Sequence, residues 1–375
     1  MRPASWKDKS VGEVLRLEYG KPLENAARKP NGKYPVYGAN GEKDRSDKFY
    51  FGKPSIIVGR KGSAGEITLT AEKFWPLDVT YFVTFDEGQY DLSFLYHLLT
   101  TLDLPSLAKG VKPGINRNEV YSQVAKIPSL PEQRRIVGII DEAFAGIAAA
   151  KTNAEKNLQN ARALFESHLQ SVFSQRGDGW VEEPIGDVAE VFDGPHATPK
   201  TVDTGPVFLG ISALQDGRIN LGETRHVTPE DFKRWTRRVR PQADDVVFSY
   251  ETRLGQAAII PSNLQCCLGR RMGLVRVDRK RLDPRFFVYQ YISAPFREFL
   301  ASRTVRGATV DRIPLKEFPS FPIYLPRSDE QELMADQLET LRDETEHLES
   351  IYRGKLLALD ALKKSLLHQA FTGQL

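Results

Sequence analysis

The sequence has very few cysteines and no long apolar run. Only Cys266 and Cys267 occur among its 375 residues, and they are adjacent, which excludes a disulfide framework and a cysteine-based zinc site. We expect two small apolar residues on a buried strand, with a vicinal redox switch as the alternative. No stretch reaches the about 20 apolar residues that a membrane helix needs, and residues 1–20 lack the apolar core of a signal peptide. We therefore expect a cytoplasmic protein.

The motifs of the common enzyme classes are missing as well. The sequence has no G-x-x-x-x-G-K-S/T phosphate loop, no H-E-x-x-H or G-x-S-x-G motif and no EF-hand loop. The glycines at 59–65 lack the strand–loop–helix context of a dinucleotide site. The histidines are scattered along the chain, at His97, His168, His196, His226, His347 and His368. These absences favour a binding protein that has no catalytic residues, metal ligands or cofactor of its own.

Charges of both signs are present but unevenly distributed. Residues 1–130 carry 19 basic and 15 acidic side chains, and residues 176–327 carry 23 and 19, so each segment has a net charge of +4. Residues 131–175 carry 5 of each sign, and residues 328–375 carry 5 basic and 10 acidic side chains, a net charge of −5. Mild basicity suits contact with nucleic-acid phosphates, and an ordinary solvated surface is the alternative explanation.

A long internal repeat organises the chain. When residues 128–175 are shifted by 198 positions without a gap, Pro128 falls on Pro326 and Glu132-Gln133 falls on Glu330-Gln331. Further identities pair Leu158, Ala163, Leu164, Ser167, Leu169 and Phe173 with Leu356, Ala361, Leu362, Ser365, Leu367 and Phe371. A repeat of this length indicates two copies of one structural unit.

Both copies have the periodicity of a long helix with one apolar stripe, because their apolar residues recur in steps of three and four. These residues are Ile136, Ile140, Phe144, Ile147, Ala150, Ala154, Leu158, Ala161, Phe165, Leu169 and Val172 in the first copy, and Met334, Leu338, Leu341, Leu348, Tyr352, Leu356, Leu359, Leu362, Leu366 and Ala370 in the second. About 40 residues make a helix of roughly 60 Å, too long for a compact domain to cover. We expect the two helices to pack antiparallel as a coiled-coil-like pair; the alternative is that each lies across its own globular domain.

A globular segment precedes each helix, and these two segments also match. VGEVLRLEYGK at 11–21 resembles IGDVAEVFDGP at 185–195. Runs of β-branched and aromatic residues bounded by Gly, Pro or Asp predict mostly strands with a few short helices. The expected fold is α+β with a pseudo-twofold internal repeat. It consists of a mostly-β domain at 1–130, a spacer helix at 131–175, a second mostly-β domain at 176–327 and a second spacer helix at 328–375.

Two basic, flexible loops in each globular segment have the composition of nucleic-acid contacts. Loop 60–65 corresponds to 250–256, and loop 109–117 corresponds to 303–312. Arginine, glutamine and glutamate pair well with guanine, adenine and cytosine edges, and basic or hydroxyl side chains reach phosphates. The candidate DNA-binding residues are Arg60, Lys61, Ser63, Lys112, Asn116, Arg117, Tyr250, Thr252, Arg253, Gln256, Arg306 and Arg312. A solvated loop is the alternative for each cluster. A further basic run at 233–240 contains Trp235, which we expect to anchor the core rather than to stack on a base.

Four motifs together resemble the specificity subunits of type I restriction–modification systems. They are YPVYGANG at 34–41, the strand and GSAG loop at 56–65, the helix start LPEQRRIV at 130–137 and HQAFTGQL at 368–375. The resemblance covers essentially the whole chain. Two features depart from a symmetric repeat: the helices differ in net charge, and the second loop reads Arg253-Leu254-Gly255-Gln256 instead of GSAG.

The resemblance implies a DNA-recognition subunit that catalyses nothing by itself. Each globular segment would be a target recognition domain for one half of a bipartite, asymmetric site on double-stranded DNA, and the helices would set the spacer between the halves. Two modification (methyltransferase) subunits would dock on the chain, and restriction (translocase and nuclease) subunits would join them. S-adenosylmethionine, ATP and Mg would bind only to those partners.

Two other functions stay open from the sequence. A helical scaffold protein could bind protein or RNA partners through its end domains, and DNA affinity that falls steeply with salt would distinguish the two. A stand-alone methyltransferase would need a binding site for S-adenosylmethionine, and the sequence contains no motif for one.

Overall fold

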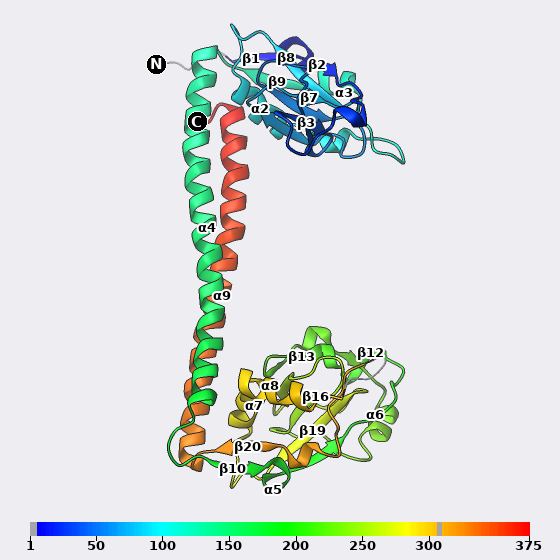
Figure 1. The fold of residues 1–375 in the computed structure, drawn as a ribbon, viewed down its shortest axis with the longest axis vertical. Helices are drawn as coiled ribbons and strands as arrows, with labels where there is room; N and C mark the ends of the chain where they lie inside the picture. Colours follow the sequence, from blue (N-terminus) through cyan, green and yellow to red (C-terminus); the bar gives the residue numbers. More distant parts are fainter. Residues whose placement is uncertain (1–5, 306–309) are drawn as a thin grey trace. The chain divides into compact units, whose positions relative to one another are not determined.

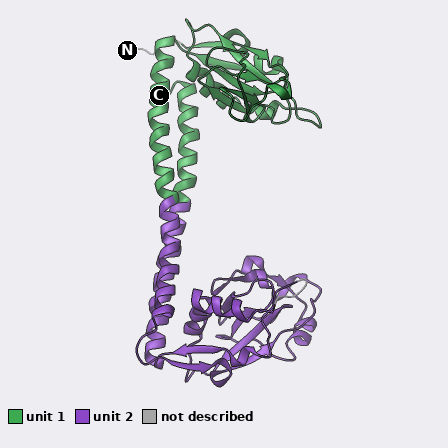
Figure 2. Ribbon diagram, in the orientation of Figure 1, with its two compact units in different colours: residues 1–155, 354–375 green, residues 156–353 purple. Residues whose placement is uncertain are grey.

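The computed structural model describes residues 6–305 and 310–375, which form two compact units (Figure 2). Unit 1 comprises Met1–Glu155 and Gly354–Leu375, and unit 2 comprises Lys156–Arg353. Each unit contains one globular head and a stretch of both long helices. We call residues 6–129 head 1, and residues 176–305 with 310–327 head 2. The expected division set the helices apart from the domains, whereas in the structure each long helix is shared between the units.

Head 1 is built on three small sheets (Figure 1). The largest is antiparallel, with strand order β2-β8-β5-β6; the second has the order β4-β3-β7, with β3 and β7 parallel; β1 pairs with β9. The strands are β1 (Lys7–Ser10), β2 (Leu15–Tyr19), β3 (Tyr34–Gly38), β4 (Gly41–Ser46), β5 (Ser55–Gly59), β6 (Ile67–Thr70), β7 (Trp75–Pro76), β8 (Thr80–Phe85) and β9 (Val124–Ile127). The helices are α1 (Val11–Val14), α2 (Leu92–Thr101) and α3 (Arg117–Tyr121), with 3-10 turns at Asn25–Ala27 and Leu104–Leu107.

Head 2 repeats this topology with additions. Its main sheet has the antiparallel order β11-β19-β16-β17, β12 and β18 pair in parallel, and β10 pairs with β20. The strands are β10 (Val181–Pro184), β11 (Ala189–Asp193), β12 (Val202–Leu209), β13 (Leu214–Gln215), β14 (Arg218–Ile219), β15 (Arg225–His226), β16 (Val246–Ser249), β17 (Ala257–Ile259), β18 (Cys266–Leu268), β19 (Met272–Val277) and β20 (Pro322–Leu325). The helices are α5 (Ile185–Val188), α6 (Pro229–Trp235), α7 (Pro284–Ile292) and α8 (Ala294–Arg303), with 3-10 turns at Ile211–Ala213, Leu221–Glu223 and Phe318–Ser320.

Equivalent residues begin the main helix of each head. The Asp91 carboxylate accepts a hydrogen bond from Phe94 N at the start of α2, and Asp283 accepts from Arg285 N and Phe286 N at the start of α7. An aspartate at this position satisfies backbone donors that the first turn leaves unpaired. The helices then bury Phe94 and Phe286 completely in the cores of their units.

The long helices are α4 (Leu130–Gln175) and α9 (Ser328–Thr372), and they pair antiparallel in each unit (Figure 1). In unit 1, Lys151 Nζ lies 2.8 Å from Asp360 Oδ1, and in unit 2, Arg162 Nε lies 3.1 Å from Glu349 Oε2. The residue numbers of each pair add up to 511, so both units share one antiparallel register. The expected coiled-coil-like pair is confirmed.

The buried residues of α4 follow the period of a coiled coil. Ile140, Ile147, Ala154 and Ala161 are all buried and stand seven residues apart, as expected for one seam position of a heptad. The two alanines let the partner helix approach closely. The apolar stripe predicted for this helix contains all four residues, so periodicity located its inner face correctly.

The inner face of α9 is more polar than predicted. Ala335, Leu338, Arg342 and Thr345 are buried in steps of three, four and three, whereas Leu348, which the predicted stripe included, is exposed. Leu362 of that stripe is exposed as well. Arg342 tolerates this position because Nε donates to Glu346 Oε1 (3.0 Å) and its guanidinium faces the Phe165 ring. A long cationic side chain can bury its stem when its head group is paired.

Both cysteines lie buried on β18, as the sequence analysis expected. Burial raises the pKa of each thiol to about 12, so neither is a thiolate near neutral pH. Among the described residues, no helix is long and apolar enough to span a bilayer.

Candidate nucleic-acid interface

The two loops predicted to contact nucleic acid in head 1 lie against each other. Gly62 N donates to Pro113 O (2.9 Å), and Ile115 N donates to Arg60 O (3.0 Å). Lys61 and Gly114 form an isolated antiparallel bridge between the loops. Loop 60–65 and loop 109–117, about 50 residues apart in the sequence, therefore form one continuous surface.

At the base of this surface, an exposed tyrosine lies between two arginines. The Arg60 guanidinium is 5.3 Å from the centre of the Tyr19 ring, and the Arg117 guanidinium is 5.0 Å from it. Tyr19 is 46% exposed. Arg60 Nη2 and Nε also donate to Asp78 O, at 2.7 and 3.1 Å, which fixes the side chain. The cluster of Tyr19, Arg60 and Arg117 can offer cationic and stacking contacts together.

The sequence analysis identified Arg60 and Arg117 but missed Tyr19. The missing signal was its position at the end of β2, where the antiparallel pairing places it opposite Tyr81 on β8. Of the other candidates in head 1, Lys61, Ser63 and Lys112 are exposed.

Asn116 has a local structural role in the same head. Its side chain accepts a hydrogen bond from Asn118 N (2.9 Å) and caps α3. The Lys109 ammonium group pairs with Glu119, which also belongs to α3. These contacts hold the second loop in place.

Head 2 builds the same loop arrangement with different residues. Ile313 N donates to Tyr250 O (2.8 Å), Thr252 N donates to Asp311 O (3.4 Å), and Glu251 and Arg312 form the isolated bridge. Each contact corresponds to one in head 1, so the internal repeat extends to individual backbone hydrogen bonds. Arg312 is exposed, and Arg306 lies outside the described residues.

The loop of head 2 differs in backbone strain. Gly62 has φ +82° in head 1, and the equivalent Thr252 has φ +68°. Positive φ costs glycine nothing and is unfavourable for a β-branched residue. Thr252 is exposed, and the surrounding backbone bonds hold it in this conformation.

Three of the predicted contact residues in head 2 are engaged by other groups of the same head. Tyr250 is 6% exposed and belongs to the core, and burial together with the nearby Asp193 carboxylate raises the pKa of its hydroxyl well above the usual value. Tyr250 therefore offers little exposed surface to a ligand, and its contact with DNA stays a prediction. Arg253 Nη1 donates to Ile211 O (3.2 Å) and Ser212 O (3.0 Å).

Gln256 is engaged on both sides of its amide. Its Oε1 accepts from Asp216 N (2.8 Å), and its Nε2 donates to Asp216 Oδ1 (2.9 Å). Arg297 Nη2 lies 2.7 Å from the same carboxylate. Burial opposes ionisation of Asp216, but the hydrogen bonds from Gln256 and Arg297 outweigh it and lower its pKa. Gln256 would have to give up these bonds to read an adenine edge.

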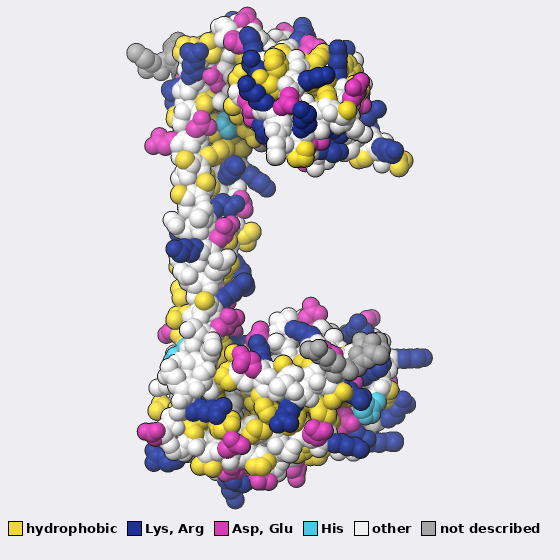
Figure 3. All heavy atoms as spheres, in the orientation of Figure 1, with side chains coloured by type: hydrophobic (Ala, Val, Ile, Leu, Met, Phe, Trp, Pro, Cys, Tyr) yellow, Lys and Arg dark blue, Asp and Glu magenta, His cyan; other side chains and the backbone are white. Residues whose placement is uncertain are grey.

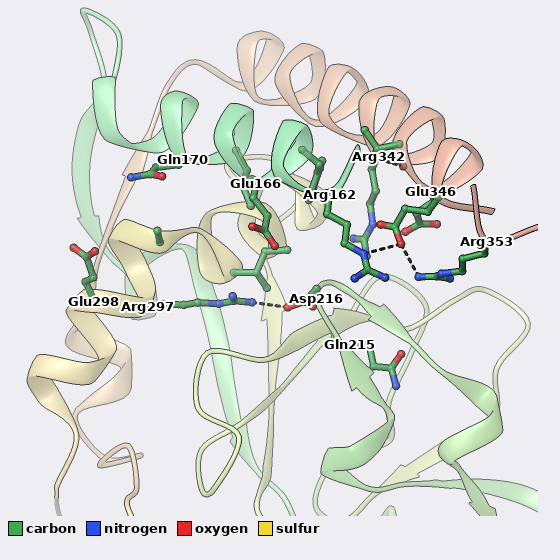
Figure 4. A pocket seen from close by; sticks show the side chains of 16 residues that line it. Arg162, Glu166, Gln170, Gln215, Asp216, Arg297, Glu298, Arg342, Glu346 and Arg353 are labelled. Carbon is green, nitrogen blue, oxygen red and sulfur yellow. Dashed lines mark hydrogen bonds and ion pairs between the residues drawn. The ribbon is translucent and has the colours of Figure 1, made fainter. Parts of the chain in front are cut away.

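These contacts line a charged cleft of about 880 Å³ in unit 2, between its helix pair and head 2 (Figure 4). Arg162 and Arg353 both approach Glu349 of α9, and Arg297 points at Asp216. Arg218 of the β13–β14 hairpin pairs with Asp343 and with Glu346 Oε2 (2.9 Å). Asp216, which binds Gln256, lies in the turn of the same hairpin. The hairpin therefore connects the loop of Gln256 to α9.

A buried glutamine ties head 1 to the start of α4. Gln133 is completely buried. Its Oε1 accepts from Asp91 N (2.9 Å), and its Nε2 donates to Gln89 O (3.1 Å) and Pro128 O (3.0 Å). All three partners are backbone groups, so this single side chain fixes α2, the preceding turn and the helix start together.

Head 2 repeats this clamp at the start of α9. Gln331 Oε1 accepts from Asp283 N (3.0 Å), and Nε2 donates to Arg281 O (3.1 Å) and Pro326 O (2.9 Å). The sequence analysis found the repeated Glu-Gln pair but not its role. The structure shows that the glutamine sets the position of the head on its helix.

Within residues 6–305 and 310–375, no group of three or more His, Cys, Asp or Glu side chains could hold a metal ion. The described residues instead form a unit built twice, in which a head with two paired surface loops is fixed to the start of a long helix by a buried glutamine. This is the architecture of a DNA specificity subunit. The sequence matches the type I restriction modification DNA specificity domain over residues 3–159 and 177–353, and the chain belongs to this family.

Individual relatives agree with this membership. The chain is 21% identical to the type I restriction enzyme EcoDI specificity subunit of Escherichia coli over 403 residues, covering 100% of this chain and 89% of the relative. It is 24% identical to the putative type I restriction enzyme MjaX specificity subunit of Methanocaldococcus jannaschii, over 70% of this chain and 61% of that relative. A solved chain of a type I R-M system has the same fold, with a TM-score of 0.75 at 18% identity over 100% of this chain and 99% of the other.

Proposed function

We propose that each head reads one half of a bipartite, asymmetric site on double-stranded DNA. The observation that carries this proposal is the loop surface built twice on the same backbone hydrogen bonds with different side chains. Two heads with the same loop backbone and different loop side chains suit two half-sites of different sequence. The scaffold alternative, with protein or RNA partners at the heads, is not favoured by family membership.

The helix pair would set the spacer between the half-sites. The 46 residues of α4 correspond to roughly 70 Å at about 1.5 Å per residue. One turn of B-DNA is about 34 Å, so helices of this length suit half-sites one or two turns apart. Gln133 and Gln331 support the same function, because helices can set the spacing of the heads only if each head is fixed to its helix.

Two modification subunits would dock on the helices and heads, and restriction subunits would complete the complex. Exposed apolar side chains on the long helices support such docking, since a partner subunit would remove them from water. They are Leu164, Leu333, Leu348 and Ile351 in unit 2 and Leu357 and Leu362 in unit 1. S-adenosylmethionine, ATP and Mg would be bound by those partners, and a cytoplasmic location belongs to the same proposal.

Sequencing of methylated bases in the host, with and without this gene, tests the function. We expect one methylated motif to disappear, made of two constant halves separated by a spacer of fixed length. Inserting four residues at matched places in α4 and α9 should change the spacer and leave both halves intact. Loss of a contiguous motif, or of none, would contradict the proposal.

A further inference from the structure

The predicted reading loop of head 2 has few free cations, and a second basic segment lies elsewhere on this head. Arg253 donates to backbone carbonyls, and Tyr250 is buried. By contrast, residues 233–240, at the end of α6 and after it, carry five cations and no carboxylate among eight residues. These cations are Lys233, Arg234, Arg237, Arg238 and Arg240, and all of them are exposed.

Core residues of α6 hold this segment in place. Phe232 is buried against Phe208, Val227 and Cys267, and Trp235 packs on the same cluster. The Thr228 side chain caps the helix by accepting from Asp231 N (3.2 Å). The sequence analysis expected Trp235 to anchor the core, and its packing in this cluster agrees. The cations that follow therefore stand on a fixed base.

Few of these cations are engaged within the chain. Arg238 Nη1 lies 3.5 Å from Asp193 Oδ2, and the Arg240 guanidinium lies 5.6 Å from the centre of the Phe232 ring. Among the described residues, no carboxylate lies within ion-pairing distance of Lys233, Arg234 or Arg237. Figure 3 shows Lys and Arg side chains gathered on the part of unit 2 where Figure 1 places α6.

A hollow of about 390 Å³ accompanies the segment. Its lining combines apolar and cationic side chains, among them Trp235, Val239, Leu268, Arg234, Arg237 and Arg238. It also includes Asp193, whose carboxylate pairs with Arg238 and His196. The Arg234 guanidinium stacks 4.5 Å from the centre of the Trp235 ring. An apolar floor with guanidinium groups around it matches one sugar–phosphate unit of a DNA strand, because the sugar is largely apolar and the phosphate accepts from arginine.

We propose that residues 233–240 hold the DNA backbone on head 2, with phosphates on Arg234, Arg237 and Arg238. This inference rests on the proposed function and adds a site to it. Head 1 has no counterpart, because residues 47–54 between β4 and β5 contain no helix. Head 2 then holds the DNA backbone through α6 and the residues after it in addition to its paired loops, whereas head 1 has the paired loops without such a helix.

The test is a salt titration of DNA binding by the full-length chain with its partner subunits. The variant Arg234→Gln, Arg237→Gln, Arg238→Gln is compared with the wild type on a mixed-sequence duplex. Each phosphate contact contributes about 0.9 to the slope of log affinity against log salt. Three lost contacts should reduce the slope by about 2.7, so the ratio of wild-type to variant affinity should shrink about 40-fold between about 50 and 200 mM salt.

A matched control removes the same charge from the opposite end of the main sheet of head 2. Arg279, Lys280 and Arg327 are exposed, and the first two follow the end of β19 that lies away from Asp193. Their glutamine triple should keep the wild-type slope. A wild-type slope in the Arg234, Arg237, Arg238 variant would overturn the proposal and leave the segment for another partner, such as an acidic protein surface.

A variant with Arg234, Arg237 and Arg238 all replaced by lysine distinguishes the loss of positive charge from a change in the fold of head 2. Lysine binds phosphate as a point charge, so this variant should recover most of the slope. If it loses the slope as the glutamine triple does, altered head geometry explains the loss and the proposal fails. A wild-type chain without sequence preference would overturn the proposed function, while the slope comparison on the mixed-sequence duplex still decides the role of this segment.

Discussion

At one equivalent position in loops 60–65 and 250–256, the two heads have the same backbone contact and very different side chains. Arg60 and Tyr250 both accept a backbone hydrogen bond from the second loop, at 3.0 and 2.8 Å. In head 1 the side chain stacks on the exposed Tyr19, and in head 2 it is buried beside Asp193. The same backbone hydrogen bonds are thus kept in both heads, while the side chains at equivalent positions differ.

The contacts between each head and its long helix also keep the same position in both units while the side chains differ. In unit 1, His97 of α2 lies 3.4 Å from Asp141 of α4. The corresponding residue of α7 in unit 2 is Tyr289, which lies near Glu339 of α9. Burial lowers the pKa of His97 and raises the pKa of Tyr289 to about 12. Of these two equivalent contacts, the one in unit 1 contains an imidazole, which titrates at a lower pH than the tyrosine in unit 2.

The largest effect is expected from replacing the two buried glutamines that fix the heads to their helices. Gln133→Leu should destabilise unit 1, and Gln331→Leu should destabilise unit 2, each by about 3 kcal/mol, because a buried donor and two buried acceptors lose their partners. Thermal unfolding of the full chain measures both. Gln159→Leu on the exposed face of α4 is the control and should change little. Unequal losses would mean that the clamps are not equivalent.

Next in size is the exchange of side chains at the equivalent loop positions. Arg60→Ala should cost about 1–3 kcal/mol of binding to the cognate site and relax preference at one base of one half-site. Tyr250→Phe, which keeps the ring in the core, should leave the other half-site unchanged. Binding to duplexes with single substitutions measures both effects. If Arg60→Ala weakens all sequences equally, Arg60 contacts phosphate instead of a base.

A smaller effect is expected from the strained loop position. Thr252→Gly should stabilise unit 2 by about 1 kcal/mol, and Gly62→Ala should destabilise unit 1 by a similar amount. A methyl group at Gly62 meets no atom within 4 Å, so its cost is conformational and not steric. Chemical denaturation measures both changes. Arg271 Nη1 donates to the Thr252 hydroxyl (3.4 Å), and a Thr252→Gly variant that is less stable would show that this contact outweighs the strain.

The smallest effect is a pH dependence confined to unit 1. Because the pKa of His97 is lower in the folded state, the unfolded chain binds more protons below its own pKa of about 6.5. Stability should therefore be complete above about pH 6.5 and decline below it, by at most about 1.4 kcal/mol per pH unit. His97→Gln should remove this decline. Calorimetry between about pH 5 and 8 measures it, and an unchanged decline would assign it to another group.

The gap-free helix repeat made much of the fold predictable. A shift of 198 residues located both long helices, and their length indicated that each packs against the other. The inner face of α9 was harder, because Arg342 and Thr345 occupy positions that hydrophobicity does not mark. Their burial depends on partners such as Glu346 and Phe165, which only the packed structure brings together.

The candidate interface was predictable in its backbone and less so in its side chains. Glycine and charge located both loops in each head, since such loops are recognisable from local sequence. Whether a side chain faces solvent depends on contacts with distant residues. Tyr250 is covered by the core of head 2, and Gln256 is held by Asp216, which is 40 residues away. Tyr19 was missed for the converse reason, because only strand pairing places it beside Arg60.

The division of the chain into two units also determines the order in which these units can fold during translation. Unit 2 is one continuous segment, Lys156–Arg353, whereas unit 1 needs Gly354–Leu375 to complete its interior. Phe371 packs against Phe94 with ring centres 5.1 Å apart, and Ala370 is completely buried. Domains usually fold from the N-terminus as they are synthesised. Here the head made first stays incomplete until residues 354–375 have been translated, so its apolar surface depends longest on protection from aggregation.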